Sequence, residues 1–154
     1  MAKDRNYDFT TKIDEIVVNT QARLLAVVRT AISNVVDDAQ TPVAKGGKMR
    51  VDTGFLRSTG LADVGKVPIG PSVSPDHATT QYPRRGKAQS YTYDGQFLNI
   101  ALSKMKIGDT FYFGWTANYA KYREAYDGFL ESALQKWQTH VDNAITRLRD
   151  RDKK

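Results

Sequence analysis

Residues 11–40 read TKIDEIVVNTQARLLAVVRTAISNVVDDAQ, and their apolar positions recur at steps of three and four. This spacing predicts a helix of about eight turns with one apolar stripe. The stripe comprises Ile13, Ile16, Val17, Thr20, Leu24, Val27, Val28, Ala31, Ile32 and Val35. We expect Thr11 to be the N-cap, and Pro42 with the Gly46-Gly47 pair to end the helix. Packing of the stripe on the chain's own sheet is the favoured interpretation, and a subunit contact through part of the helix is the alternative.

Residues 41–90 differ in composition from the rest of the chain, because they hold all five prolines and seven of the eleven glycines. Eight Lys and Arg stand against three Asp, which gives this segment five of the chain's six net positive charges. Such a composition predicts mainly irregular structure, with one short strand or helical turn at 54–61 and an extended loop over 64–90. Loops of that length are usually functional or disordered, so this one points to a partner.

Two segments between residues 91 and 116 are rich in aromatic and branched residues, FLNIAL at 97–102 and TFYFGW at 110–115. The turn-forming stretch 106–109 separates them, which predicts a β-hairpin, and residues 91–93 are a candidate for an earlier strand. Helical spacing returns over 128–148, with Asp127 as the candidate N-cap.

This order of elements predicts a single α+β domain over residues 1–154. The long N-terminal helix and the C-terminal helix would pack on a small, mainly antiparallel β-sheet, and a long Pro/Gly-rich basic loop would extend from it. No apolar run of about 20 residues occurs, and the N-terminus lacks the apolar core of a signal peptide, so we expect neither a membrane span nor a leader.

The sequence offers little support for catalysis. It contains no Cys, which excludes disulfides, thiol catalysis and Cys-ligated metals. His77 in the loop and His140 in the last helix are expected at the surface or at the edge of a buried face, and no Ser has an evident His and Asp partner. Asp37 and Asp38 lie near the C-terminal end of the first predicted helix, and we expect solvent to surround them there. An ionic contact with another part of the chain is the alternative. We therefore expect no enzyme activity, catalytic residue, metal ligand or cofactor.

The net charge of +6 leaves nucleic-acid contact open without requiring it. Arg84, Arg85 and Lys87 lie in the basic loop near Tyr82 and Tyr91. A loop that is solvated or that docks on a partner is the favoured interpretation of these cations. A small basic nucleic-acid-binding domain is the alternative, because cations interleaved with aromatic rings can hold phosphates and stacked bases.

Two short stretches carry a more specific signal. The first reads VDTGFLRST at 51–59, and the second reads YAKYRE at 119–124, followed by GFL at 128–130. A V-D-T-G-x-L-R-x-S/T segment after a long N-terminal helix, then a strand pair, Y-A-x-Y-x-E and a final helix opened by Phe-Leu, resembles the tail-completion and head–tail connector (neck) proteins of long-tailed bacteriophages. The resemblance covers nearly the whole chain, which departs from that pattern in Ala125-Tyr126-Asp127 and in the length of the loop 64–90.

The resemblance implies a structural virion protein that forms a ring, expected to be a hexamer, at the head–tail interface or at the tail end. Its partners would be further copies of itself, the neighbouring connector or adaptor, and tail-tube or tail-terminator proteins, with genomic DNA passing through the lumen. Assembly would take place in the cytoplasm of the bacterial host. The residues that carry the motifs, and that are candidates for subunit contacts, are Asp52, Thr53, Gly54, Leu56, Arg57, Tyr119, Tyr122, Arg123, Glu124 and Phe129.

Residue chemistry suggests roles for several of these positions. Asp52-Thr53-Gly54 is a turn sequence, after which Leu56 enters the core while Arg57 points away. Tyr119 and Tyr122 are three residues apart and would share one face of a helical turn. Arg123 and Glu124 would then form an exposed charged pair suited to a subunit rim, with ordinary core and surface positions as the alternative.

We predict that deletion of residues 70–86 leaves a soluble chain that melts cooperatively but fails to complete particles, whereas Leu56→Asp abolishes folding. The loop has few large apolar residues, so its burial cannot offset the entropy lost on ordering it. Amide exchange on the free protein gives the direct measurement. Protection of residues 70–86 equal to that of the C-terminal helix would contradict this prediction.

Overall fold

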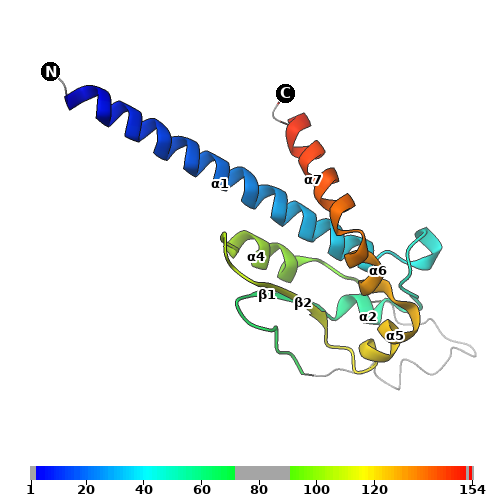
Figure 1. Ribbon diagram of the computed structural model, residues 1–154. Coiled ribbons are helices and arrows are strands. Elements are labelled where there is room, and N and C mark those ends of the chain that lie inside the picture. The colour runs from blue at the N-terminus through cyan, green and yellow to red at the C-terminus, as the bar shows by residue number, and fades with distance from the viewer. Residues whose placement is uncertain (1–2, 72–90, 152, 154) are drawn as a thin grey trace, which may run out of the picture.

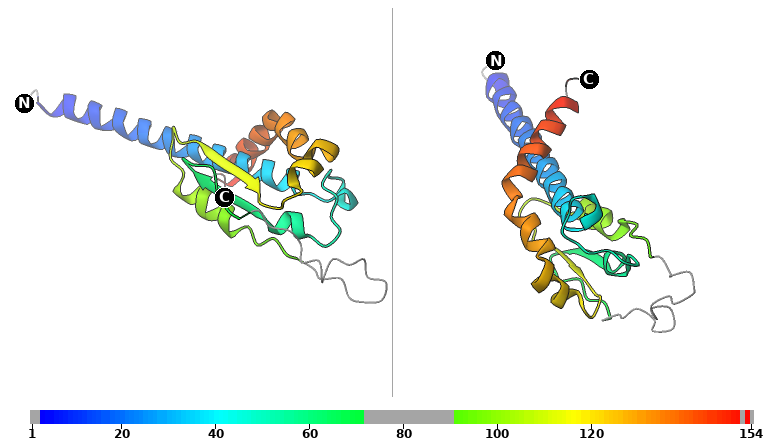
Figure 2. Two further views of the ribbon diagram at one scale, coloured as in Figure 1. Left: turned by 90° about the horizontal axis from the view of Figure 1, so that it is seen from below. Right: turned by 90° about the vertical axis from the view of Figure 1, so that its right-hand side faces the viewer.

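The computed structural model describes residues 3–71, 91–151 and 153 of the 154-residue chain (Figure 1). Within these ranges the chain is mixed α+β, with six α-helices packed on a small two-stranded antiparallel sheet, as the sequence predicts. Helices α6 (Phe129–Gln135) and α7 (Trp137–Arg151) pack against the long N-terminal helix α1 (Lys3–Ala39), and α4 (Gln96–Lys104) packs on strand β1 (Gly60–Val64) (Figure 2).

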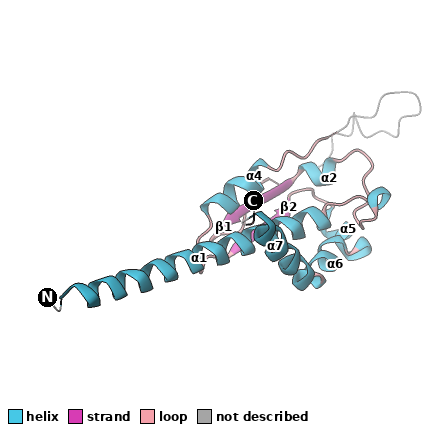
Figure 3. Cartoon of the chain, turned by 90° about the horizontal axis from the view of Figure 1, so that it is seen from above, coloured by secondary structure: helices cyan, strands magenta, loops and turns pink. Residues whose placement is uncertain are grey.

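Helix α1 begins at Lys3, so the expectation that Thr11 caps it is wrong. Its 37 residues span about 55 Å, which is longer than the layer of elements beneath it. The C-terminal half is built into the core through Ala31, Val35, Val36 and Ala39, and the N-terminal half projects beyond the other elements (Figure 3). The expected packing of the stripe on the chain's own sheet therefore holds only for the C-terminal half of the helix.

The two strands of the sheet are not the two strands of the predicted hairpin. Strand β2 (Phe111–Trp115) lies where a strand is expected, but it pairs with β1 in a register that runs from Gly60 opposite Trp115 to Val64 opposite Phe111. Residues 97–102 belong to helix α4 and not to a strand. Residues 91–93 are also not a strand; the Tyr91 N–H donates to the Thr53 carbonyl over 2.8 Å.

Helical spacing explains why α4 forms in place of a strand. Leu98, Ala101 and Leu102, which lie at steps of three and four, are buried, whereas the intervening Phe97 and Ile100 are half-exposed. The helix begins after a glycine at φ +70, and the Asp94 carboxylate accepts a hydrogen bond from the Gln96 N–H over 3.0 Å. The apolar run FLNIAL therefore has one buried helical face and not the two faces of a strand.

The predicted C-terminal helix is divided. Helix α5 (Ala120–Asp127) precedes α6, and Lys136 separates α6 from α7. The expected cap Asp127 is instead the last residue of α5, and Gly128, with φ +61, takes the left-handed conformation between the two helices. Short helices η1 (Val43–Lys45) and α2 (Phe55–Ser58) lie between α1 and β1, which agrees with the helical turn expected at 54–61.

Three buried clusters join the layers. The first contains Met49, Phe55, Leu56, Ala117 and Phe129, the second Val35, Ala39 and Ala133, and the third Val36, Leu98 and Leu102. Trp115 packs against the first two, and Phe113 beside it packs against the third. Strand β2 is thus the element that connects all three clusters. No helix within the described ranges is both long enough and apolar enough to cross a bilayer.

We predict that Phe129→Ala lowers the free energy of unfolding by about 3–5 kcal/mol, because the ring is 1% exposed and its removal leaves a cavity between α6 and β2. Tyr122→Ala is the matched control, since its ring is 75% exposed, and we expect a change within about 0.5 kcal/mol. Urea unfolding followed by circular dichroism measures both values. Equal losses in the two variants would contradict the assignment of Phe129 to the core.

Candidate functional site

The first motif folds into a turn that only glycine can complete. Gly54 has φ +83, and a Cβ atom at this position would lie 2.4 Å from the Tyr91 carbonyl oxygen. The Thr53 hydroxyl accepts a hydrogen bond from the Phe55 N–H over 3.4 Å, while the Asp52 side chain is exposed. The turn therefore holds the segment after residue 90 against the start of α2.

Leu56 is buried, as expected, but Arg57 does not point into solvent. The Arg57 side chain is half-buried, and its Nε has no hydrogen-bond partner among the described residues. Burial raises the pKa of the neighbouring Tyr93 phenol, and the Arg57 charge opposes that rise. Arg57 thus belongs to the interior edge of the domain.

The two motifs meet in space. Thr59, the last residue of the first motif, is buried, and its hydroxyl accepts a hydrogen bond from the Ala117 N–H over 3.2 Å. The rings of Phe55 and Tyr119 lie 6.2 Å apart, and Phe129 is in the same cluster. The structure therefore brings together segments of the chain that are about 60 residues apart in the sequence.

The two tyrosines of the second motif lie in different surroundings. Tyr119 is half-buried against the first core cluster, and burial raises the pKa of its phenol, with Arg123 opposing and Asp52 adding to the rise. Tyr122 is 75% exposed on α5, as is Tyr126 one turn later. The expected shared face of Tyr119 and Tyr122 thus has one half-buried and one exposed member.

Arg123 and Glu124 are half-buried and do not form an exposed charged pair. The Glu124 carboxylate accepts hydrogen bonds from the Leu130 and Glu131 N–H groups over 2.8 and 2.9 Å, which caps the start of α6. Arg123 pairs with Asp127, one turn further along α5. Both side chains therefore hold the junction between α5 and α6.

A cation–aromatic cluster at this junction was not predicted from the sequence. The Asp127 side chain is 4% exposed and pairs with Arg50 over 3.3 Å as well as with Arg123. Both guanidinium groups lie over the ring of Tyr126, at 5.4 and 5.9 Å from its centroid. The spacing of Arg123 and Asp127 was a visible signal, but the contribution of Arg50 depends on the tertiary fold.

Helices α1 and α7 are joined by an ionic contact, which was the alternative for Asp38. Its carboxylate lies 3.2 Å from both Lys136 Nζ and His140 Nε2. His140 is buried and not at the surface, and its backbone carbonyl accepts a hydrogen bond from Asn34. Among the described residues no group of three or more His, Cys, Asp or Glu is placed to hold a metal ion.

The cations of the basic loop, Arg84, Arg85 and Lys87, lie outside the described residues, as does His77. The described motif residues are therefore distributed between a shared core and the α5–α6 junction.

No family model, curated protein or solved structure matches the chain.

We predict that Glu124→Ala lowers the free energy of unfolding by about 1–2 kcal/mol, because two N–H groups at the start of α6 lose their acceptor. Glu131→Ala removes the same charge from an exposed neighbour and should change stability by less than about 0.5 kcal/mol. Chemical denaturation of both variants gives the comparison. A Glu124→Ala protein as stable as Glu131→Ala would show that the cap is unimportant.

Proposed function

We propose that this chain is a structural virion protein that forms a ring of six copies at a phage head–tail interface or tail end, where it completes or joins the tail. Its function in this proposal is closure and not catalysis. Its neighbours would be connector or adaptor proteins on one side and tail-tube or tail-terminator proteins on the other. The ring would form in the host cytoplasm and remain in the virion neck or tail, with DNA passing through its lumen.

The observation that carries the proposal is an uncovered apolar stripe on the projecting half of α1. Five large apolar side chains of this stripe between residues 9 and 24 are 44–67% exposed. They are Phe9, Ile13, Ile16, Val17 and Leu24. Exposed apolar patches beyond a few hundred Å² generally mark interaction surfaces, so this half of the helix needs a partner.

The same chain offers a second, different apolar surface. Phe97 and Ile100 on α4 are 55% and 50% exposed, and Val67 and Ile69 after β1 are 60% and 95% exposed. A groove of about 240 Å³ beside β1 is lined by Phe97, Val67 and Ile69. The projecting half of α1, which we call the arm, and this groove are unlike surfaces. Contacts between unlike surfaces form a ring when the rotation that relates neighbouring copies brings the last copy back to the first.

The order of the two sequence motifs supports the same proposal. They follow a long N-terminal helix and precede a C-terminal helical region, in the sequence order on which the resemblance to neck and tail-completion proteins depends. The motif residues Leu56 and Phe129 lie in one buried cluster, which gives their joint occurrence a physical reason. Both residues stabilise the folded domain from which the projecting half of α1 extends.

We predict that Ile16→Glu weakens self-association at least about tenfold while leaving the melting temperature of the monomer unchanged. A buried carboxylate in an apolar contact is strongly unfavourable, but residue 16 is 61% exposed in the isolated chain. Light scattering over rising protein concentration measures the association, and negative-stain electron microscopy identifies rings.

Asn19→Glu is the matched control, since it adds the same charge to an exposed position outside the stripe. It should associate like the wild-type chain. A wild-type protein that forms only a tight dimer, or that stays monomeric both alone and with purified phage tails, would overturn the proposal of a ring.

A further inference from the structure

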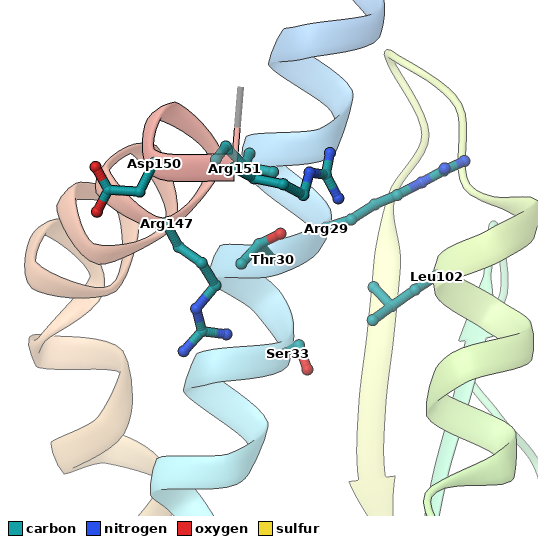
Figure 4. A pocket seen from close by; sticks show the side chains of 8 residues that line it. Arg29, Thr30, Ser33, Leu102, Arg147, Asp150 and Arg151 are labelled. Atoms are coloured by element: carbon teal, nitrogen blue, oxygen red, sulfur yellow. The ribbon is translucent and has the colours of Figure 1, made fainter. Parts of the chain in front are cut away.

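Two grooves flank the last turns of α7 where this helix lies beside α1. The first has a volume of about 600 Å³ and is lined by Arg147 and Arg151 of α7 and by Arg29 of α1 (Figure 4). The hydroxyl-bearing residues Thr30 and Ser33 also line it. The groove thus combines three guanidinium-bearing residues with two further hydrogen-bond donors.

The second groove, of about 830 Å³, is lined by cations from the same two helices. Arg149, Arg151 and Lys153 come from the C-terminal end of the chain, and Arg23 comes from α1. On α7, Arg147 and Arg151 are four residues apart and share one face, whereas Arg149 lies on the opposite side of the helix, which explains why both sides of its last turns are basic.

The positive charge of these grooves is only partly neutralised. Burial raises the pKa of the nearby Asp37 carboxyl and the charge of Arg147 opposes that rise, so Asp37 offsets part of the charge of Arg147. Asp150 is the one carboxylate among their described lining residues, and it points away from the three arginines of the first groove (Figure 4). The ion pairs found in the described part of the chain involve other cations. Arg29 differs from the other groove cations, because its guanidinium donates to the backbone carbonyls of Ser103 and Met105 at the C-terminal end of α4, where the helix dipole favours a cation.

Favourable interaction with the helix dipole accounts for only part of this arrangement. Basic residues in the last turn of a helix are stabilising, which covers Arg149 and Arg151. Arg23 lies in the middle of α1, away from both ends of that helix. Its position beside the end of α7 is therefore a property of the tertiary fold and favours an external anion.

We propose that this pair of grooves, which we call the basic cleft, binds the phosphodiester backbone of duplex DNA. Arginine and hydroxyl side chains are common phosphate ligands. Residues 147–151 extend about 6 Å along α7, and duplex DNA presents one negative charge for about every 1.7 Å of its axis, so about three phosphates would face this length. The aromatic residues that stack on single-stranded bases, or that anchor protein interfaces, are absent from the described lining residues.

The basic cleft goes beyond the proposed ring, because a monomer already contains both grooves. It also differs from the loop that holds Arg84, Arg85 and Lys87. Within a ring, repeated copies of the cleft would place cations around DNA without reading its sequence. DNA binding and ring formation can therefore be tested separately.

Fluorescence anisotropy of a labelled duplex of about 20 base pairs, at monomeric protein concentrations and salt from about 50 to 200 mM, tests the proposal. We expect wild-type binding that weakens steeply with salt. Arg147→Glu/Arg151→Glu should weaken binding about tenfold or more and reduce the salt slope by about 2. Arg147→Gln/Arg151→Gln should give a smaller loss in the same direction, and a single strand of equal length should bind more weakly than the duplex.

Lys45→Glu/Lys48→Glu is the control, because it changes the net charge equally at exposed positions away from the cleft. Circular dichroism melting establishes that each variant is folded. Equal losses in the control and cleft variants would overturn the proposal, as would loss of binding only on replacement of Arg84, Arg85 and Lys87. A cleft variant that keeps its DNA affinity but loses self-association would identify a protein interface and overturn the DNA site.

Discussion

The contact between Trp115 and Phe129 is the interaction on which the rest of the described structure depends. Their rings meet edge to face with centroids 5.1 Å apart, and Phe129 is almost completely buried. Trp115 ends β2 and also packs against the cluster of α1 and α6 residues, so one side chain joins the sheet, the long helix and the C-terminal helices. The Glu124 cap and the left-handed Gly128 set the direction in which Phe129 enters this contact.

Features that depend on local spacing could be predicted from the sequence. The stripe of α1 follows from a period of three and four residues, and β2 follows from its density of aromatic residues. Burial of Leu56 follows from the turn at Gly54. These elements, with the C-terminal helical region, are sufficient to predict the α+β class, because each one has an apolar face that another must cover.

Features that depend on distant partners could not be predicted. Strand β1 is a short segment, GLADV, whose partner β2 begins 47 residues after it ends. The segment FLNIAL is short enough to suit a strand or a helix, and the Asp94-Gly95 start was the signal that favoured a helix. The pairing of Arg50 with Asp127 and the placement of Arg23 beside Arg149 likewise arise only after the chain has folded.

The burial pattern separates the residues that build the body from those that remain available for partners. Leu56 and Phe129 pack in the core, and Glu124 caps a helix of the same chain. Replacement of these residues therefore lowers the stability of the subunit first and affects assembly only as a consequence. The stripe at residues 9–24 and the cations at 147–153 are exposed, and a change there leaves the described core intact. Because the stripe is apolar and the cleft is cationic, salt should act on them differently: it weakens contacts with phosphates by screening and leaves apolar association almost unaffected. This difference in physical origin is what allows ring formation and DNA binding to be separated within one small chain.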